Sequence, residues 1–336
     1  MIPTGIYNII KANRDERNKN NNNTKGDLSS SSLKKYTNSV NSIYKQLGVD
    51  EPMTPAVFIK HIDKVKSIIN NAKTLSTAHA YAVAMFVFTN DAAYNALMME
   101  KSKEKEEQVM KRERTEKQKK NWITKKEIHK KLNDLEKIAN AVYEKHSLGQ
   151  SLNDKDYQDI QDFILVLVSC DKYLPLRRSL DWCAFKISDI NLEADNYITE
   201  DGAALVFNTY KTAAAKGKQV LHFNKYKYRN NTDWDFYSKK GAMIIKRELL
   251  RWIAINPTEY LFFTTKFRKP LSAYNITNWF NRIFEQNVST NMLRNILMTD
   301  RHEKIINQFE QAKRAMSVGG SSASMLMNYV KDLMKT

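Results

Sequence analysis

The sequence changes character near its middle, over His146–Asn153, and this change most constrains the fold. Before it, from Leu33 to Glu144, the pattern is helical and dense in charge. After it, an apolar helix is followed by short β-rich segments broken by turns, and then by more helices. We therefore predict a mainly α chain with a small β-sheet, in which a helical domain precedes an α+β domain.

The first part is predicted to hold a tail and a helical domain. Residues 1–31 are polar, with runs of Asn and Ser, and are predicted to be a disordered tail. Residues 32–148 are predicted to form the helical domain. Its expected helices are Leu33–Leu47, Thr54–Asn71, Ser76–Thr89 and two long, largely solvated helices over Asp91–Glu144 that are interrupted near Asn121–Thr124.

Residues 149–336 are predicted to form the second domain, because Gly149 and its polar neighbours break the helical pattern. It opens with an apolar helix, Tyr157–Ser169. Short strands are expected at Asn196–Thr199, Ala203–Thr209 and Gln219–Phe223, the first two joined at an Asp201-Gly202 turn. Further helices are expected at Ser238–Ile255, Ser272–Gln286, Thr290–Thr299, Glu303–Met316 and Ser321–Met334.

The charge balance points to a polyanionic partner. The 336 residues carry 54 Lys and Arg against 37 Asp and Glu, a formal net charge of +17. Nucleic acid is the favoured partner; a merely basic surface and an anionic membrane face are the alternatives. Without a long apolar stretch or a signal-peptide core, an intracellular protein of cytoplasm or nucleus is expected. Heavy use of Asn, Lys and Ile suggests an AT-rich genome, such as that of a virus or mobile element.

Neither a cofactor nor a metal is expected. The sequence has no phosphate-cradling Gly-rich loop and no carboxylate cluster at metal-ligand spacing. Its two cysteines, Cys170 and Cys183, have no metal-ligand company and are interpreted as buried thiols.

Two arginines stand out in the second domain. Arg177 lies in Leu174–Trp182, at the start of a helix that follows an apolar helix, where a guanidinium could grip a phosphate. Arg294 lies near the start of another helix, where backbone amides also favour anions. Taken singly, each also fits an ordinary surface arginine.

Two other positions carry candidate chemistry. Lys211 follows a predicted strand and precedes another, so it would lie on a hairpin; Lys216 and Lys218 are alternatives, and all three also fit solubility charges. Tyr329 shares a helical face with Met325 and Leu333, a spacing that by itself is typical of a core residue.

In their order along the chain, these segments resemble the motifs of the tyrosine recombinase (integrase) family. Leu176-Arg177-Arg178-Ser179 resembles its first arginine box, Lys211 its hairpin lysine, and Met292-Leu293-Arg294-Asn295 its second box. Val318-Gly319-Gly320-Ser321-Ser322 resembles the turn that lies nine positions before the family's tyrosine, here Tyr329. The resemblance covers roughly residues 155–330.

Two positions depart from the family's pattern. Asn291 stands where the second box usually begins with His or Lys, and Gly320 stands at the family's His/Trp position. An amide can still donate a hydrogen bond to a phosphoryl oxygen, whereas glycine offers no side chain. Losing one such donor typically costs about 10² to 10³ in rate, so slowed chemistry or an inactive DNA-binding relative remains an alternative.

The resemblance implies a DNA recombination mechanism. Arg177, Arg294 and Asn291 would stabilise the phosphoryl oxygens, Lys211 would protonate the leaving 5′ oxygen, and Tyr329 would join the 3′ phosphate covalently. It also implies double-stranded DNA as partner, a homo-tetramer on two duplexes and a helical core-binding domain in residues 32–148. A type IB topoisomerase, which uses a similar constellation, is the enzyme alternative.

Overall fold

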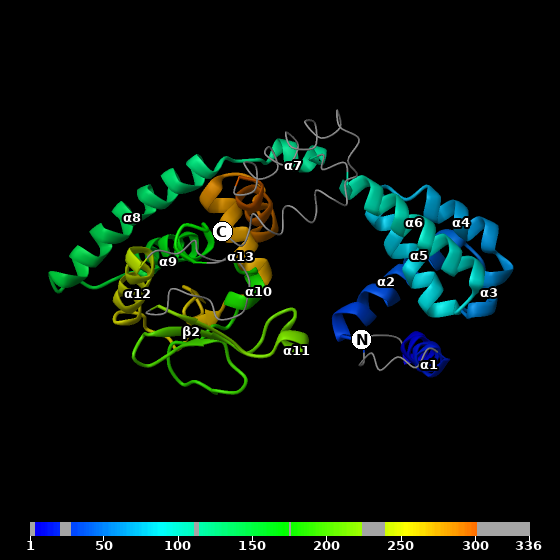
Figure 1. Ribbon diagram of the computed structural model, residues 1–336, viewed down its shortest axis with the longest axis horizontal. Helices are drawn as coiled ribbons and strands as arrows, with labels where there is room; N and C mark the ends of the chain where they lie inside the picture. Colours follow the sequence, from blue (N-terminus) through cyan, green and yellow to red (C-terminus); the bar gives the residue numbers. More distant parts are fainter. Residues whose placement is uncertain (1–3, 21–27, 111–113, 175, 224–238, 301–336) are drawn as a thin grey trace, which may run out of the picture. The chain divides into compact units, whose positions relative to one another are not determined.

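The computed structural model describes residues 4–20, 28–110, 114–174, 176–223 and 239–300. Packing divides the chain into two compact units, Met1–Arg114 and Thr115–Thr336. The structure is mainly helical with a small antiparallel sheet, as predicted (Figure 1). No helix within the described ranges combines the length and apolar character needed to cross a membrane.

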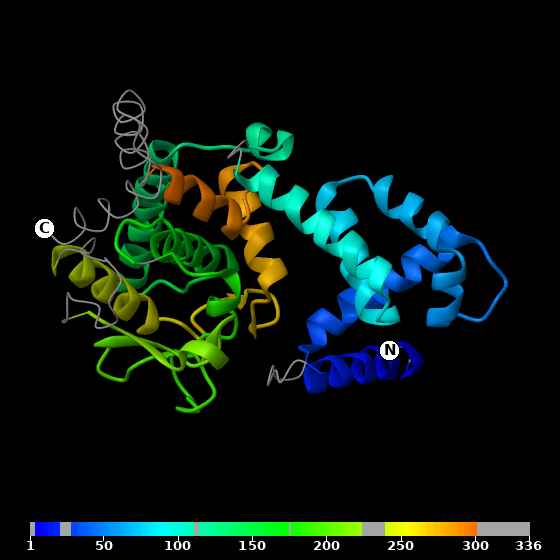
Figure 2. The same cartoon turned by 45° about the vertical axis from the view of Figure 1, so that its right-hand side comes forward.

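The first unit is a bundle of helices around one central helix. Its helices are α1 (Thr4–Asn20), α2 (Ser30–Leu47), α3 (Pro55–Lys60), α4 (Ile62–Asn70), α5 (Leu75–Thr89) and α6 (Ala92–Met110). Helix α5 contacts the other five, and Figure 2 shows the bundle from a second side. Because α5 carries apolar or small residues around most of its circumference, it suits the interior of the bundle.

The N-terminal segment corrects the prediction of a disordered tail over residues 1–31. Residues 4–20 form α1, whose Ile6 and Ile10 are buried. The Nδ2 of Asn13 donates a hydrogen bond to the carbonyl of Phe88 at 2.7 Å. The Ser run begins helix α2, because the Ser29 side chain caps the N-terminus of this helix. The two buried isoleucines at helical spacing explain why a polar segment still docks.

Among the described residues, every strand belongs to the second unit. Its helices are α7 (Glu116–Lys120), α8 (Lys125–Ser147), α9 (Asp154–Ser169), α10 (Ser179–Trp182), α11 (Ala213–Lys216), α12 (Lys239–Ile253) and α13 (Ala273–Phe284), with a further helix at 290–300. Its strands are β1 (Tyr197–Ile198), β2 (Ala204–Phe207), β3 (Gln219–His222), β4 (Phe263–Thr264) and β5 (Lys269–Pro270). The predicted helices at 303–316 and 321–334 lie outside the described residues.

Helix α8 belongs to the second unit, which moves the boundary from the predicted position between residues 148 and 149. It packs along α9 and buries Ile128, Leu132 and Val142 in the core of that unit. The division falls instead between Arg114 and Thr115. The dense charge of α8 lies on its outer face, and only six of its 23 residues are buried, so the predicted largely solvated helix is amphipathic and packs its apolar side on the core.

The strands β1, β2 and β3 form an antiparallel sheet in that order, within the predicted segments. Phe207 at the end of β2 pairs with Gln219 at the start of β3. The β1–β2 turn contains the predicted Gly202, whose φ is +61°. This positive φ favours glycine, and a Cβ added there would lie 2.6 Å from Cδ2 of Leu250, so the Leu250 side chain would have to move.

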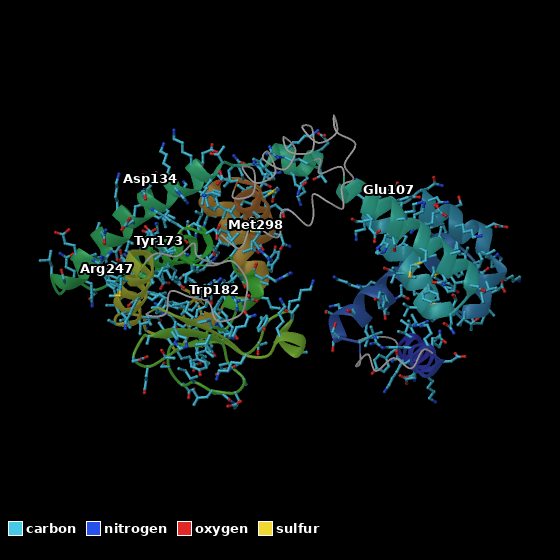
Figure 3. The ribbon with its side chains drawn as sticks, viewed as in Figure 1. Glu107, Asp134, Tyr173, Trp182, Arg247 and Met298 are labelled. Atoms are coloured by element: carbon cyan, nitrogen blue, oxygen red, sulfur yellow. The ribbon has the colours of Figure 1, made fainter. Side chains whose placement is uncertain are left out.

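The core of the second unit surrounds α9 and Trp182. Every residue of α9 from Ile160 onward is buried. The ring of Trp182, which is labelled in Figure 3, packs against the rings of Phe185, Phe207 and Phe262 at centroid distances of 5.4, 5.5 and 6.4 Å. The anchored tryptophan ends α10, so this short helix and the loop before it are held against the sheet.

Candidate functional site

Arg177 lies just before α10 and is held on several sides by its own chain. Its Nε lies 3.2 Å from Oδ2 of Asp181, and its Nη1 donates a hydrogen bond to Oε1 of Gln219 at 2.7 Å. Its guanidinium carbon lies 3.7 Å from the ring centre of Phe207 and 5.5 Å from that of Tyr210. Only 10% of the Arg177 side chain is exposed.

Asp181 is the acidic centre of this region, with only 5% of its side chain exposed. Burial raises the pKa of its carboxyl, while the charges of Arg177, Arg178 and Arg294 and the backbone N–H of Arg178 act to lower it. That N–H lies 3.4 Å from Oδ2 of Asp181. The positive charges of three arginines therefore act on one buried carboxylate. The sequence analysis did not identify Asp181 as part of the site.

Arg294 comes to the same place from the helix at 290–300. The Ser289 hydroxyl caps this helix by accepting from the N–H of Met292 at 3.2 Å. Thr290 lies one turn before Arg294, and its buried hydroxyl hydrogen-bonds the Ser179 hydroxyl at the start of α10. This bond ties together the two segments that carry Arg178 and Arg294.

The surroundings of Arg294 are unfavourable for its positive charge. Burial lowers the pKa of Arg294, and the neighbouring positive charge of Arg178 lowers it further; Asp181 acts in the opposite direction. The buried Nε of Arg294 has no hydrogen-bond partner among the described residues. An anion near Arg178 and Arg294 would relieve both conditions.

Lys211 lies in the β2–β3 connection, as predicted, and is exposed. Lys216 and Lys218 share this connection, which includes α11, and are exposed as well. The Tyr210 hydroxyl donates to the carbonyl of Gly217 at 2.6 Å, which closes the loop. All three lysines stay candidates for the role that the sequence gave to Lys211.

The β2–β3 connection is also tied to α10 through Asn196. Its buried Nδ2 donates to the carbonyl of Asp181 at 3.0 Å and to that of Thr209 at 2.7 Å. Its Oδ1 accepts from the N–H of Thr209 at 2.8 Å. Hydrogen bonds therefore join the lysine-bearing connection to the segment that carries Arg177 and Asp181.

The structure brings together some of the predicted site residues. Arg177 contacts Asp181, the charge of Arg294 also acts on Asp181, and Gln219 at the base of the β2–β3 connection contacts Arg177. Asn291 is exposed next to Thr290, and its side chain makes no hydrogen bond to the cluster among the described residues. Tyr329 and Gly320 lie outside the described residues.

Several residues of this region were missed by the sequence analysis. Asp181 follows Arg177 by four positions, a spacing that favours a helical ion pair and could have identified it. Arg178 was present in the matched arginine box but was given no role. Gln219 and Asn196 carry no local signal, because their contacts depend on the sheet register and on the position of α10.

Over the described ranges, no group of three or more His, Cys, Asp or Glu side chains is placed to hold a metal ion. Comparisons with protein-family models, with curated proteins and with solved structures found no match.

Proposed function

We propose that this protein is a site-specific DNA recombinase or integrase that breaks and rejoins DNA through a covalent 3′-phosphotyrosine intermediate. The observation that carries the proposal is the convergence of Arg177, Arg178 and Arg294, from two distant segments, around one buried carboxylate. A lysine-bearing connection is hydrogen-bonded to the same region. Together these features support binding and activation of a phosphodiester.

The proposed chemistry uses cations to overcome the resistance of a phosphodiester to attack. The guanidiniums would bind the non-bridging oxygens and stabilise the charge of the transition state. A tyrosine hydroxyl with an ordinary pKa of about 10 is mostly protonated near neutral pH, and nearby cations favour its ionised form. Tyr329 would attack phosphorus and become joined to the 3′ phosphate, while Lys211 would protonate the leaving 5′ oxygen.

The intermediate keeps the energy of the broken bond for the reverse step. A 5′ hydroxyl from another strand would attack the phosphotyrosine and release Tyr329. Asn291 would add a hydrogen bond to a phosphoryl oxygen once DNA is bound. Neither a metal nor a nucleotide cofactor is part of this proposal.

Double-stranded DNA is the proposed partner, and the formal net charge of +17 supports it. The helical first unit would act as a core-binding domain whose basic side chains contact phosphates. The proposed assembly is a homo-tetramer on two duplexes, acting inside the cell, with a virus or mobile element as the proposed origin.

Covalent capture on nicked duplexes tests the proposal. A nick close to the cleavage point lets the short cleaved fragment leave, so the protein stays attached to DNA on a denaturing gel. We expect an adduct from the wild type and none from Tyr329→Phe, which lacks only the nucleophilic oxygen. Salt-sensitive DNA binding without any adduct would instead support the inactive DNA-binding relative.

Relaxation of supercoiled plasmid separates the recombinase from the topoisomerase. A recombinase acting without a partner site should relax little plasmid, whereas a type IB topoisomerase acts alone as a swivel. Efficient relaxation that disappears in Tyr329→Phe would therefore reassign the protein to the topoisomerase class.

A further inference from the structure

We propose that Arg178, rather than Arg177, pairs with Arg294 to hold the scissile phosphate, and that Arg177 is a positioning residue for the β2–β3 connection. This inference rests on the proposed function and changes the role that the sequence resemblance gave to Arg177. It follows from what each of the three guanidiniums already contacts.

Arg177 is committed to contacts within the protein. Its Nε faces Asp181, its Nη1 donates a hydrogen bond to Oε1 of Gln219, and its guanidinium carbon lies 3.7 Å from the centre of the Phe207 ring. Removing one partner of a buried ion pair leaves an uncompensated charge, which strongly destabilises the fold. Arg177 would have to give up its contacts with Asp181 and Gln219 to turn those N–H groups toward DNA.

Arg178 is placed differently, although it is the next residue. It is partly exposed, and its contact with Asp181 uses the backbone N–H. Its side chain is the positive neighbour that acts most strongly on Arg294. The two positive charges repel each other. An anion that accepts hydrogen bonds from both guanidiniums attracts each of them and so offsets this repulsion.

The charge count of the cluster agrees with an anion site. Three guanidiniums and one ionised carboxylate give 3 − 1 = +2 for these four side chains. With Arg177 paired to Asp181, the remaining charge resides on Arg178 and Arg294. The buried Nε of Arg294, unpartnered among the described residues, supplies a donor for a phosphoryl oxygen.

Arg177 contacts residues at both ends of the connection that carries the lysines. Gln219, which accepts its hydrogen bond, is the first residue of β3 and pairs with Phe207 across the sheet. Tyr210, whose ring lies 5.5 Å from the guanidinium, closes the connection through Gly217. Loss of Arg177 would therefore loosen the loop that carries Lys211.

The decisive experiment compares two substrates with one variant set. The nicked duplex that gives the most adduct with wild type is prepared with a normal phosphate and with a methylphosphonate at the cleavage point. The methyl group removes the negative charge of one non-bridging oxygen, so an arginine that neutralises this charge becomes less important. The rate of adduct formation is measured for wild type, Arg177→Ala, Arg178→Ala and Arg294→Ala.

On the phosphate we expect Arg178→Ala and Arg294→Ala to slow adduct formation by about 10² to 10³, the usual effect of one lost oxyanion donor. On the methylphosphonate we expect their deficit to shrink to about tenfold or less. Arg177→Ala should show the same deficit on both substrates and a lower melting temperature. Gln219→Leu, which removes only one hydrogen bond to Arg177, provides a milder second variant with the same substrate-independent deficit.

Two results would overturn the proposal, and they are distinguishable. If Arg177→Ala recovers on the methylphosphonate while Arg178→Ala does not, Arg177 is the phosphate ligand and the recombinase proposal stands. If wild type forms no adduct with any duplex, the recombinase proposal fails, and this assignment fails with it.

Discussion

At the residue scale, Asp181 sets the balance of the arginine cluster. It is nearly fully buried, and its carboxylate is shared by Arg177 through an ion pair and by Arg178 through a backbone N–H. Burial disfavours its ionised form, while the arginines favour it, and the net effect raises the pKa of the carboxyl. The ionised Asp181 carboxylate holds the Arg177 guanidinium in place. The position of Arg177 therefore depends on the protonation state of Asp181.

The raised pKa of Asp181 predicts a specific dependence of stability on pH. The folded state binds a proton at Asp181 more tightly than the unfolded chain does, so protonation of this carboxyl stabilises the fold. This contribution to the free energy of unfolding is fully present below the ordinary carboxyl pKa of about 3.9 and is lost as the pH rises through the raised pKa. We expect the unfolding free energy of wild type, relative to Asp181→Asn, to fall as the pH rises from the ordinary carboxyl pKa through the raised pKa of Asp181.

Denaturant unfolding of both proteins at several pH values measures this difference. Taking the difference cancels the titration of the other carboxyl groups, which both proteins share. A difference that rises with pH would show that the arginines outweigh burial and hold the pKa of Asp181 below its ordinary value.

At the element scale, the arginine cluster depends on how α10 meets the helix at 290–300. The buried hydroxyls of Ser179 and Thr290 bind each other at this junction. Helix α13 also contacts α10 and leads into the 290–300 segment through the Ser289 cap. A small rotation of either helix would change the separation of Arg178 and Arg294.

Thr290→Val tests this junction, because valine keeps the shape of threonine and removes the hydroxyl. The Ser179 hydroxyl would be left buried without this partner, which costs about 1 to 3 kcal/mol of unfolding free energy. We expect that loss in thermal or denaturant unfolding, together with slower adduct formation on the nicked duplex.

The matched control is Thr277→Val in α13. Thr277 donates to the carbonyl of Ala273 within its own helix at 3.0 Å, so this hydrogen bond does not join α13 to another segment. It should change adduct formation little. Equal rates for the two variants would contradict the claim that the Ser179–Thr290 bond positions the arginines.

The helix ends show which elements could be predicted from sequence. Ser272 and Thr74 cap α13 and α5, so polar capping residues beside apolar periodicity fixed these helices to within a residue or two. The long segment 54–71 was predicted as one helix but is broken near His61 into α3 and α4. No Gly or Pro marks this break, so local pattern could not reveal it.

At the scale of the whole molecule, the sequence did not predict the features that depend on packing between distant segments. Helix α8 looks solvated in sequence because its charges are many, yet its apolar stripe covers α9. Among site residues, sequence brought Arg177 and Arg294 to notice, but the contacts of Arg177 with Gln219 and Phe207 require the folded sheet. The contacts of Arg177 therefore could not be predicted from its position in a motif alone.

The net charge also acts at the scale of the whole molecule. A protein that neutralises about 6 to 10 DNA phosphates loses about 10³ to 10⁵ in affinity between 50 and 200 mM salt. With a formal net charge of +17, we expect a loss of at least about 10³ for binding to a duplex of about 30 base pairs. Fluorescence anisotropy across that salt range measures it; a change below about tenfold would argue against backbone binding of DNA.

The most direct test of the central claim is to identify the atom that joins protein to DNA. The adduct from a nicked duplex is digested with protease and nuclease, and the modified peptide is sequenced by mass spectrometry. The proposed function predicts a nucleotide attached through its 3′ phosphate to the Tyr329 hydroxyl. Attachment to another residue, or through a 5′ phosphate, would contradict the account.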